Sequence, residues 1–303
     1  MIVLEQLLNG VQFGVTLFLM SAGLTLIFGI MGVINLAHGS LYMIGAYAAA
    51  LVAAHTGSFG LALLGGLAAT AASGVVIEFV VVRRLYDRDH LDQVLATFAL
   101  ILIINQSASM LFGRQPLFVA MPATLSGSVT LLPGLVYPVY RLIVIGLGLL
   151  VAAGLFLLIN YTRVGMLVRA GATHRQMVRA LGVNVRWLYT VVFGLGALLA
   201  GLAGIIAGPI TSVQVGMGEQ VLIFAFVVVV IGGLGSVRGA FFGALVAGIV
   251  DTLARAFLPM IFRHMMDGSN ADALASGMSS ISIYLLMALV LLIRPQGLVA
   301  GKS

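Results

Sequence analysis

Long apolar runs separated by short polar segments dominate the chain. From Gln6 to Ile77 there is no Asp, Glu, Lys or Arg, whereas a single helix needs only about 20 apolar residues to cross roughly 30 Å of hydrocarbon. The runs are continuous and lack the alternation typical of a membrane β-barrel. We therefore predict an all-α polytopic membrane protein with about nine transmembrane helices, eight or ten remaining possible, over residues 5–30, 36–54, 59–82, 94–112, 139–162, 188–210, 219–236, 239–258 and 279–294.

Composition supports a single transmembrane domain over residues 1–303 with no soluble domain. The chain is 61% hydrophobic and 8% charged, whereas soluble domains carry about 25% charged residues. Its net charge of +6 comes from arginines scattered through short loops, which indicates cytoplasmic loops rather than a nucleic-acid partner. The absence of cysteine excludes a disulfide, a thiolate nucleophile and a Cys-ligated metal.

One loop is unusually basic. Residues 163–186 hold five arginines and no acid, between the charge-free stretches 142–162 and 187–218. Arginine is costly in hydrocarbon, so this segment should lie in water at a membrane face. At helical spacing Met177, Val178, Leu181 and Val185 share one side, while arginines share another. The pattern predicts a short amphipathic helix able to dock a soluble partner, although an ordinary positive-inside loop would also carry such charge.

The arginines also predict the orientation of the chain. With the N-terminus outside and nine alternating spans, eleven basic residues lie inside, namely Arg83, Arg84, Arg88, Arg163, Arg169, Arg175, Arg179, Arg186, Arg238, Arg294 and Lys302. Only Arg114, Arg141, Arg255 and Arg263 then lie outside. The positive-inside rule favours this orientation. Two longer outside loops follow from it: residues 113–138, expected to be irregular because they contain four prolines, and the polar stretch 259–278.

Several polar residues fall within apolar runs, where they are candidates for function. The most distinctive segment is GIMGVINLAHG (residues 29–39), whose glycines, Asn35 and His38 interrupt a helix pattern. Such breaks can line a substrate path. Alternatively, the segment is an interfacial turn in which Asn35 caps the next helix.

Two carboxylates are expected to be structural. Glu78 lies five and six residues before Arg83 and Arg84, so pairing at the interface is favoured over proton relay. Asp251 and Arg255 are spaced for an i,i+4 ion pair. Trp187 and Tyr189 are typical of an interfacial aromatic anchor. We expect no enzyme activity and no metal site, because the histidines lack HExxH spacing and no nucleophile elbow is present.

Four stretches resemble the membrane subunits of branched-chain amino acid ABC importers, the hydrophobic amino acid uptake family. They are GLTLIFGIMGVINLAHGSLYMIGAY (residues 23–47), the basic segment continuing to residue 204, VVIGGLGSVRGAFFGALVAGI (residues 229–249) and LLIRPQGL (residues 291–298). The NLAHG and GGLGSxxGAxxG strings are the most specific. The order and spacing of the four also match.

The resemblance implies a multi-pass permease of the bacterial inner membrane. It implies a second, homologous permease, two cytoplasmic ATP-binding subunits, a periplasmic amino-acid-binding protein and surrounding lipid as partners. ATP would be bound by those partners, since the chain has no GxxxxGK[ST] loop, and no cofactor is expected. The coupling contact with the ATPase would use Ala170, His174, Arg175, Met177, Val178, Leu181, Gly182 and Asn184 within a cytoplasmic loop spanning residues 163–187.

The resemblance implies a branched-chain amino acid as substrate, on a path near Gly29, Asn35, His38 and Gly232. Two alternatives stay open at this point. One is a permease of the same family for urea or short amides. The other is an ion-coupled secondary transporter, which would need no docking helix and would need more ionisable residues than Glu78 and Asp251 along its path.

The orientation can be tested by labelling. Because the native chain has no cysteine, single cysteines introduced at Thr173 and Ser126 would be the only thiols. We expect a membrane-impermeant maleimide to label Ser126→Cys from the periplasm and Thr173→Cys only from the cytoplasm. Periplasmic labelling of both variants would contradict the predicted topology.

Overall fold

The computed structural model describes residues 1–119, 121–122, 125–173, 175–180, 182–266 and 268–299. Within these ranges nine apolar helices occupy the positions of the nine predicted spans: α1 (Ile2–Met31), α2 (His38–Thr56), α3 (Phe59–Val80), α4 (His90–Phe112), α5 (Val139–Tyr161), α8 (Val185–Ala207), α9 (Met217–Gly232), α10 (Val237–Arg263) and α11 (Gly268–Ile293). Seven are long and apolar enough to cross a membrane. The other two are α2 and α9; α9 has 16 residues and is about 24 Å long. The chain is an all-α polytopic membrane protein.

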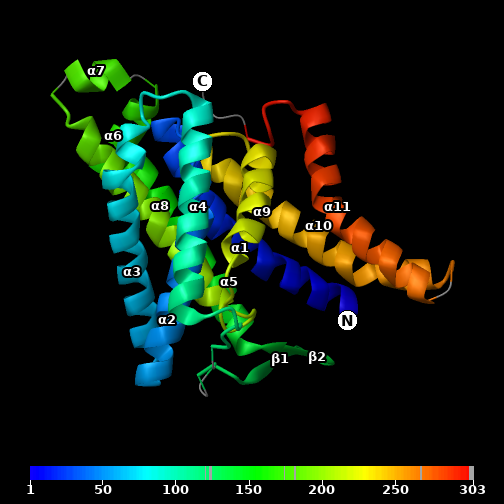
Figure 1. Cartoon of the computed structure of the whole chain (residues 1–303). Helices are drawn as coiled ribbons and strands as arrows, with labels where there is room; N and C mark the ends of the chain where they lie inside the picture. The colour runs from blue at the N-terminus through cyan, green and yellow to red at the C-terminus, as the bar shows by residue number, and fades with distance from the viewer. Residues whose placement is uncertain (120, 123–124, 174, 181, 267, 300–303) are drawn as a thin grey trace.

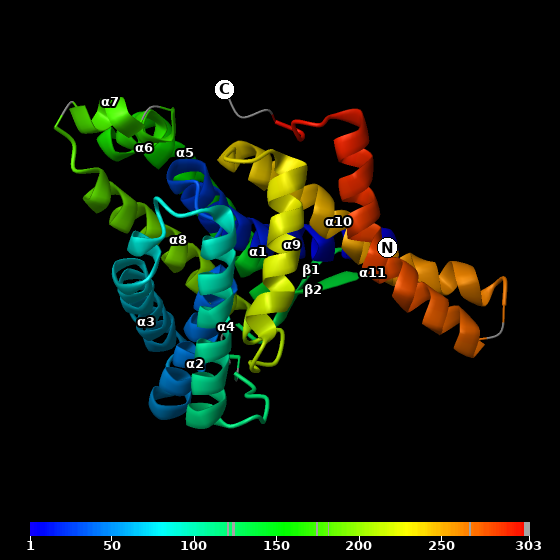
Figure 2. The ribbon, with the colours of Figure 1, turned by 45° about the horizontal axis from the view of Figure 1, so that its top comes forward.

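Helix α1 forms the interior of the bundle (Figures 1 and 2). Of its most apolar 18 residues, 83% are buried, compared with 17% for the equivalent windows of α4, α5, α10 and α11. Helix α8 is the next most buried, at 67%. The exposed faces of the outer helices are rich in Leu, Ile, Val and Phe, as expected of surfaces in contact with lipid.

Glycine allows the inner helices to approach backbone to backbone. A Cβ atom on Gly14 of α1 would lie 2.8 Å from the carbonyl oxygen of Ala244 in α10, and one on Gly23 would lie 2.7 Å from that of Gly196 in α8. Neither distance is tolerated by real side chains. Small residues at helix crossings are the usual basis of close packing in membranes, where lipid removes the hydrophobic drive for helices to associate.

The first outside loop is more regular than the sequence suggested. Residues 113–138 were expected to be irregular, but strands β1 (Ser128–Leu132) and β2 (Leu135–Pro138) form an antiparallel hairpin. Its turn passes through Gly134, whose φ of +86° favours glycine. A backbone bridge from Leu117 to Val213 also joins this loop to the segment after α8. Pro133 does lie in the turn of the hairpin, whereas Pro138 ends β2. Strands of four or five residues are too short to give a clear sequence pattern.

The second predicted outside loop is mostly helical. Residues 259–278 were expected to be a polar loop, but α10 continues through Pro259 to Arg263 and α11 already begins at Gly268. Arg263 forms an ion pair of 2.9 Å with Asp272 across this turn. The polar residues of this stretch therefore belong to a short turn between two helices, and to the helix ends beside it, rather than to a long loop. Both views show α10 and α11 projecting together from the bundle (Figures 1 and 2).

The two ends of the bundle differ in character. Two short helices, α6 (Arg163–Thr173) and α7 (Arg175–Ala180), lie at one end, and the β-hairpin lies at the opposite end (Figure 1). We call these the basic end and the hairpin end. In the predicted orientation the basic end is cytoplasmic.

Candidate functional site

The helical part of the basic segment is shorter than the sequence predicted. The prediction was a single helix through Ala170–Asn184, but the described helical residues of this segment, in α6 and α7, extend no further than Ala180. Gly182 then adopts a φ of +81°, which interrupts the helix. His174 and Leu181 lie outside the described residues, and Arg175 is described only as the first residue of α7.

Asn184, one of the predicted coupling residues, begins α8 instead. Its side-chain oxygen accepts a hydrogen bond of 3.2 Å from the backbone N–H of Trp187, as an N-cap residue does. Val185, predicted to share a face with Met177, is therefore part of α8 and is buried there.

The predicted apolar face of α7 is divided between two environments. Val178 is only 4% exposed, whereas the adjacent Met177 is 61% exposed. Neighbouring residues on a helix point about 100° apart, so Val178 anchors α7 to the protein while Met177 points outward. An exposed apolar side chain beside arginines at the basic end is a suitable contact for a soluble protein.

Helix α6 connects this segment to the membrane core. A Cβ atom on Gly171 would lie 3.4 Å from the Leu188 side chain of α8 and 3.9 Å from the Ile30 side chain of α1. The basic segment therefore rests directly on the two most buried helices.

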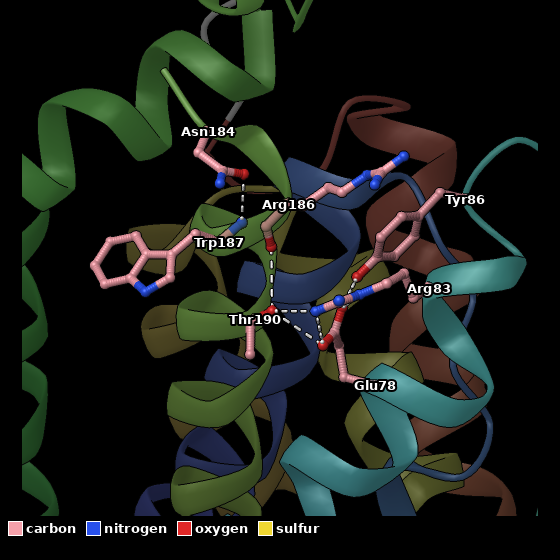
Figure 3. Close-up of polar contacts among 7 residues, drawn as sticks. All are labelled: Glu78, Arg83, Tyr86, Asn184, Arg186, Trp187 and Thr190. Atoms are coloured by element: carbon pink, nitrogen blue, oxygen red, sulfur yellow. Dashed lines mark hydrogen bonds and ion pairs between the residues drawn. The ribbon is translucent and has the colours of Figure 1, made fainter. Parts of the chain in front are cut away.

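A polar network fastens α8 to α3 just below the basic segment (Figure 3). Glu78, fully buried near the end of α3, forms an ion pair with Arg83, with a guanidinium nitrogen 3.0 Å from a carboxylate oxygen. The hydroxyl of Thr190 in α8 donates to the same carboxylate at 3.0 Å, and that of Tyr86 donates to its other oxygen. The predicted interfacial pairing of Glu78 is confirmed for Arg83, whereas Arg84 donates to the carbonyl oxygen of Val80 instead.

No signal in the sequence pointed to Tyr86 or Thr190. Thr190 is 112 positions from Glu78, and Tyr86, eight positions away, lies beyond the end of α3, where helical spacing no longer predicts contacts. Burial raises the pKa of the Tyr86 hydroxyl, and its hydrogen bond to the carboxylate raises the pKa further. The ring of Tyr86 also packs edge-on against Tyr189, with centroids 5.0 Å apart. Of the two predicted aromatic anchors, only Trp187 is exposed (Figure 3); Tyr189 is buried and serves this network instead.

A cavity of about 600 Å³ opens between the network and the start of α8. Its lining includes Arg83, Tyr86, Asp87, Asn184 and Arg186. The cavity therefore lies at the basic end, between α7 and the Glu78 network. Among the described residues, no group of three His, Cys, Asp or Glu side chains is placed to hold a metal ion.

The predicted substrate-path segment forms the break between α1 and α2. Its backbone is held by α4, since the N–H groups of Ile34 and Leu36 donate to the side chains of Gln93 and Thr97, both at 3.2 Å. The side chain of Asn35 is fully buried and does not cap α2, whose N-cap is Ala37. The capping interpretation was therefore wrong.

The structure brings Gly29 close to the segment that follows Gly232, and it places His38 elsewhere along α1. A Cβ atom on Gly29 would lie 3.0 Å from Gly235, three residues after Gly232, so the two glycine-rich breaks meet. The segment after α11 packs against them, since the N–H of Val299 donates to the carbonyl oxygen of Gly232 at 3.2 Å. His38 is fully buried with its imidazole against Gly23 of α1. A role for these residues on the substrate path stays a prediction.

The Glu78 network generates a stability prediction. Thr190→Val removes one donor to a buried carboxylate with almost no change in volume, so we expect a loss of about 1 kcal/mol. The measurement is thermal unfolding of the purified protein in detergent. Thr211→Val is the matched control, because that hydroxyl donates only to Ala207 in the preceding helical turn and should matter less. Equal shifts for the two variants would contradict the role given to the network.

Comparison with known proteins is consistent with this arrangement. Residues 6–293 match the family described as the permease component of branched-chain amino acid transport systems. The high-affinity branched-chain amino acid transport permease BraD of Pseudomonas aeruginosa is 31% identical, over 97% of this chain and 95% of its own length. LivH of Escherichia coli K12, a permease with the same description, is 28% identical over 97% and 94%.

A more distant relative is the ribose import permease RbsC of Escherichia coli K12, which is 28% identical over 77% of this chain and 72% of its own. The family match covers nearly every residue, and seven helices can span a membrane. The chain belongs to the branched-chain amino acid transport permease family and is a multi-pass subunit of the inner membrane.

Proposed function

We propose that this chain is the membrane-spanning permease subunit of an ATP-driven importer for branched-chain amino acids. The single observation that carries the proposal is the exposed Met177 on α7, in an arginine-rich segment that rests on α1 and α8. A secondary transporter has no need of such a surface. The names of the relatives BraD and LivH support the substrate class.

The complete importer would contain this permease, a second homologous permease, two cytoplasmic ATP-binding subunits and a periplasmic binding protein. In it, α7 would sit in a cleft of one ATP-binding subunit. Movement of α7 would pass to α1 and α8 through Gly171, and to α3 through Thr190 and Glu78. Two discrete arrangements of these packed helices would give alternating access to a substrate path.

The coupling role of α7 can be tested with two substitutions at one position. Met177→Asp places a charge in the proposed contact, where it would lose hydration without a partner. Met177→Leu keeps the apolar volume. We expect the Asp variant to lose ATP-driven leucine uptake by the whole complex in proteoliposomes and the Leu variant to retain it. Native uptake and ATP hydrolysis by a correctly inserted Met177→Asp variant would show that α7 does not dock the ATPase.

The substrate class is tested by competition. In vesicles holding the whole complex, unlabelled isoleucine and valine should displace radiolabelled leucine uptake, and urea and short amides should not. Uptake should stop when ATP is withdrawn. Displacement by urea or amides alone would favour the alternative substrate within the family, and uptake that collapses with the proton gradient would identify an ion-coupled transporter.

A further inference from the structure

A second polar cluster lies at the hairpin end, between the N-terminal half of α1, the start of α5 and the middle of α10. It surrounds an open cavity of about 400 Å³, which is within the range of about 300–1,000 Å³ typical of small-ligand sites. We call it the α1–α10 cavity. Its polar lining consists of Gln6, Asn9, Gln12, Arg141, Asp251, Thr252 and Arg255.

One charge pair in this cavity is only partly enclosed. Asp251 is buried, with a side chain 5% exposed, and both of its oxygens accept from Arg255, at 2.8 and 3.0 Å. The Arg255 side chain is 49% exposed. The predicted i,i+4 pair is therefore confirmed, and both of its residues line the cavity.

The other cation in the cavity forms no ion pair with a described carboxylate. Arg141 donates to the side-chain oxygen of Asn9, an uncharged amide that also accepts from the hydroxyl of Tyr137 at 3.1 Å. Across the described residues, the ion pairs join Arg83 to Glu78, Arg255 to Asp251 and Arg263 to Asp272. Arg141 is in none of them. The cavity thus contains two guanidinium groups and one carboxylate.

This charge arrangement matches a zwitterion. A carboxylate suits the planar donor face of a guanidinium, and an ammonium group suits the buried carboxylate of Asp251. Phe13, which also lines the cavity and packs edge-on against Phe224 at 6.2 Å between centroids, offers an apolar surface for an aliphatic side chain. Polar groups that fix orientation beside an apolar wall are the usual plan of a small-molecule site.

We propose that the α1–α10 cavity binds the α-amino acid substrate on its way through the permease, with Arg141 holding its carboxylate and Asp251 its ammonium group. The proposal rests on the proposed function, which makes an amino acid the cargo and the hairpin end the face that receives it. Because α1 packs on α10 through Gly14 and Gly248 directly beside the cavity, a shift between these helices would alter the site.

The test is equilibrium binding of radiolabelled leucine to the complete permease–ATPase complex in lipid nanodiscs without the binding protein. Leucine should bind weakly, because a transported substrate must also be released. Leucinamide, which lacks the carboxylate, and 4-methylpentanoate, which lacks the amine, should each compete at least about tenfold less well than unlabelled leucine. The analogues require no substitution, so this measurement does not depend on the folding of a variant.

Two variants locate the binding. Arg141→Gln should weaken leucine binding roughly tenfold or more. The control is Arg263→Gln, which removes an arginine at the C-terminal end of α10, outside the cavity lining, and should bind leucine as the native complex does. Unchanged binding in Arg141→Gln, equal competition by leucinamide, or no leucine binding to a complex that transports leucine would each overturn the proposal. Failure of the native complex to import any branched-chain amino acid would instead overturn the proposed function.

Discussion

The whole bundle depends on backbone-to-backbone packing around α1. Lipid solvates an apolar side chain as well as another helix does, so helices in a membrane gain stability chiefly from close van der Waals contact. Glycines supply that contact on two sides of α1, toward α10 at Gly14 and toward α8 at Gly23, at distances that leave no space for a Cβ atom. Where these helices cross, any side chain larger than hydrogen would force them apart and disturb every element that rests on them.

The same helix connects the two ends of the molecule. Its C-terminal turn contacts α6 through Ile30, and its N-terminal turns contribute Asn9 and Gln12 to the α1–α10 cavity. Tightly packed interiors do not deform continuously but shift between discrete arrangements. A docked ATPase that moves α6 and α7 therefore acts on an element that also lines the opposite cavity, and this gives the proposed coupling a physical route.

The two buried carboxylates that form ion pairs follow one rule. Glu78 and Asp251 are each enclosed by protein, and each is paired with an arginine, five and four residues later respectively, whose side chain is partly exposed, at 29% and 49%. A lone buried charge would be costly, and a long arginine side chain can place its charge near water while its stem remains in apolar surroundings. At the basic end Thr190 and Tyr86 also donate to the carboxylate, so the pair belongs to a network that joins α3 to α8. At the hairpin end the carboxylate of Asp251 itself lines a cavity, which is why the two pairs are assigned different roles.

The sequence by itself determined the approximate number and positions of the apolar helices, the local Arg83–Glu78 and Asp251–Arg255 pairs and the family, because these follow from composition, short spacing and specific strings. It failed where a decision depended on distant neighbours. The β-hairpin, the start of α8 at Val185 and the opposite environments of Met177 and Val178 are set by contacts with other parts of the fold. So are the joining of Thr190 to Glu78 and of Arg141 to Asn9. Only tertiary structure decides such contacts, because close helix packing, and not spacing along the chain, brings those atoms together.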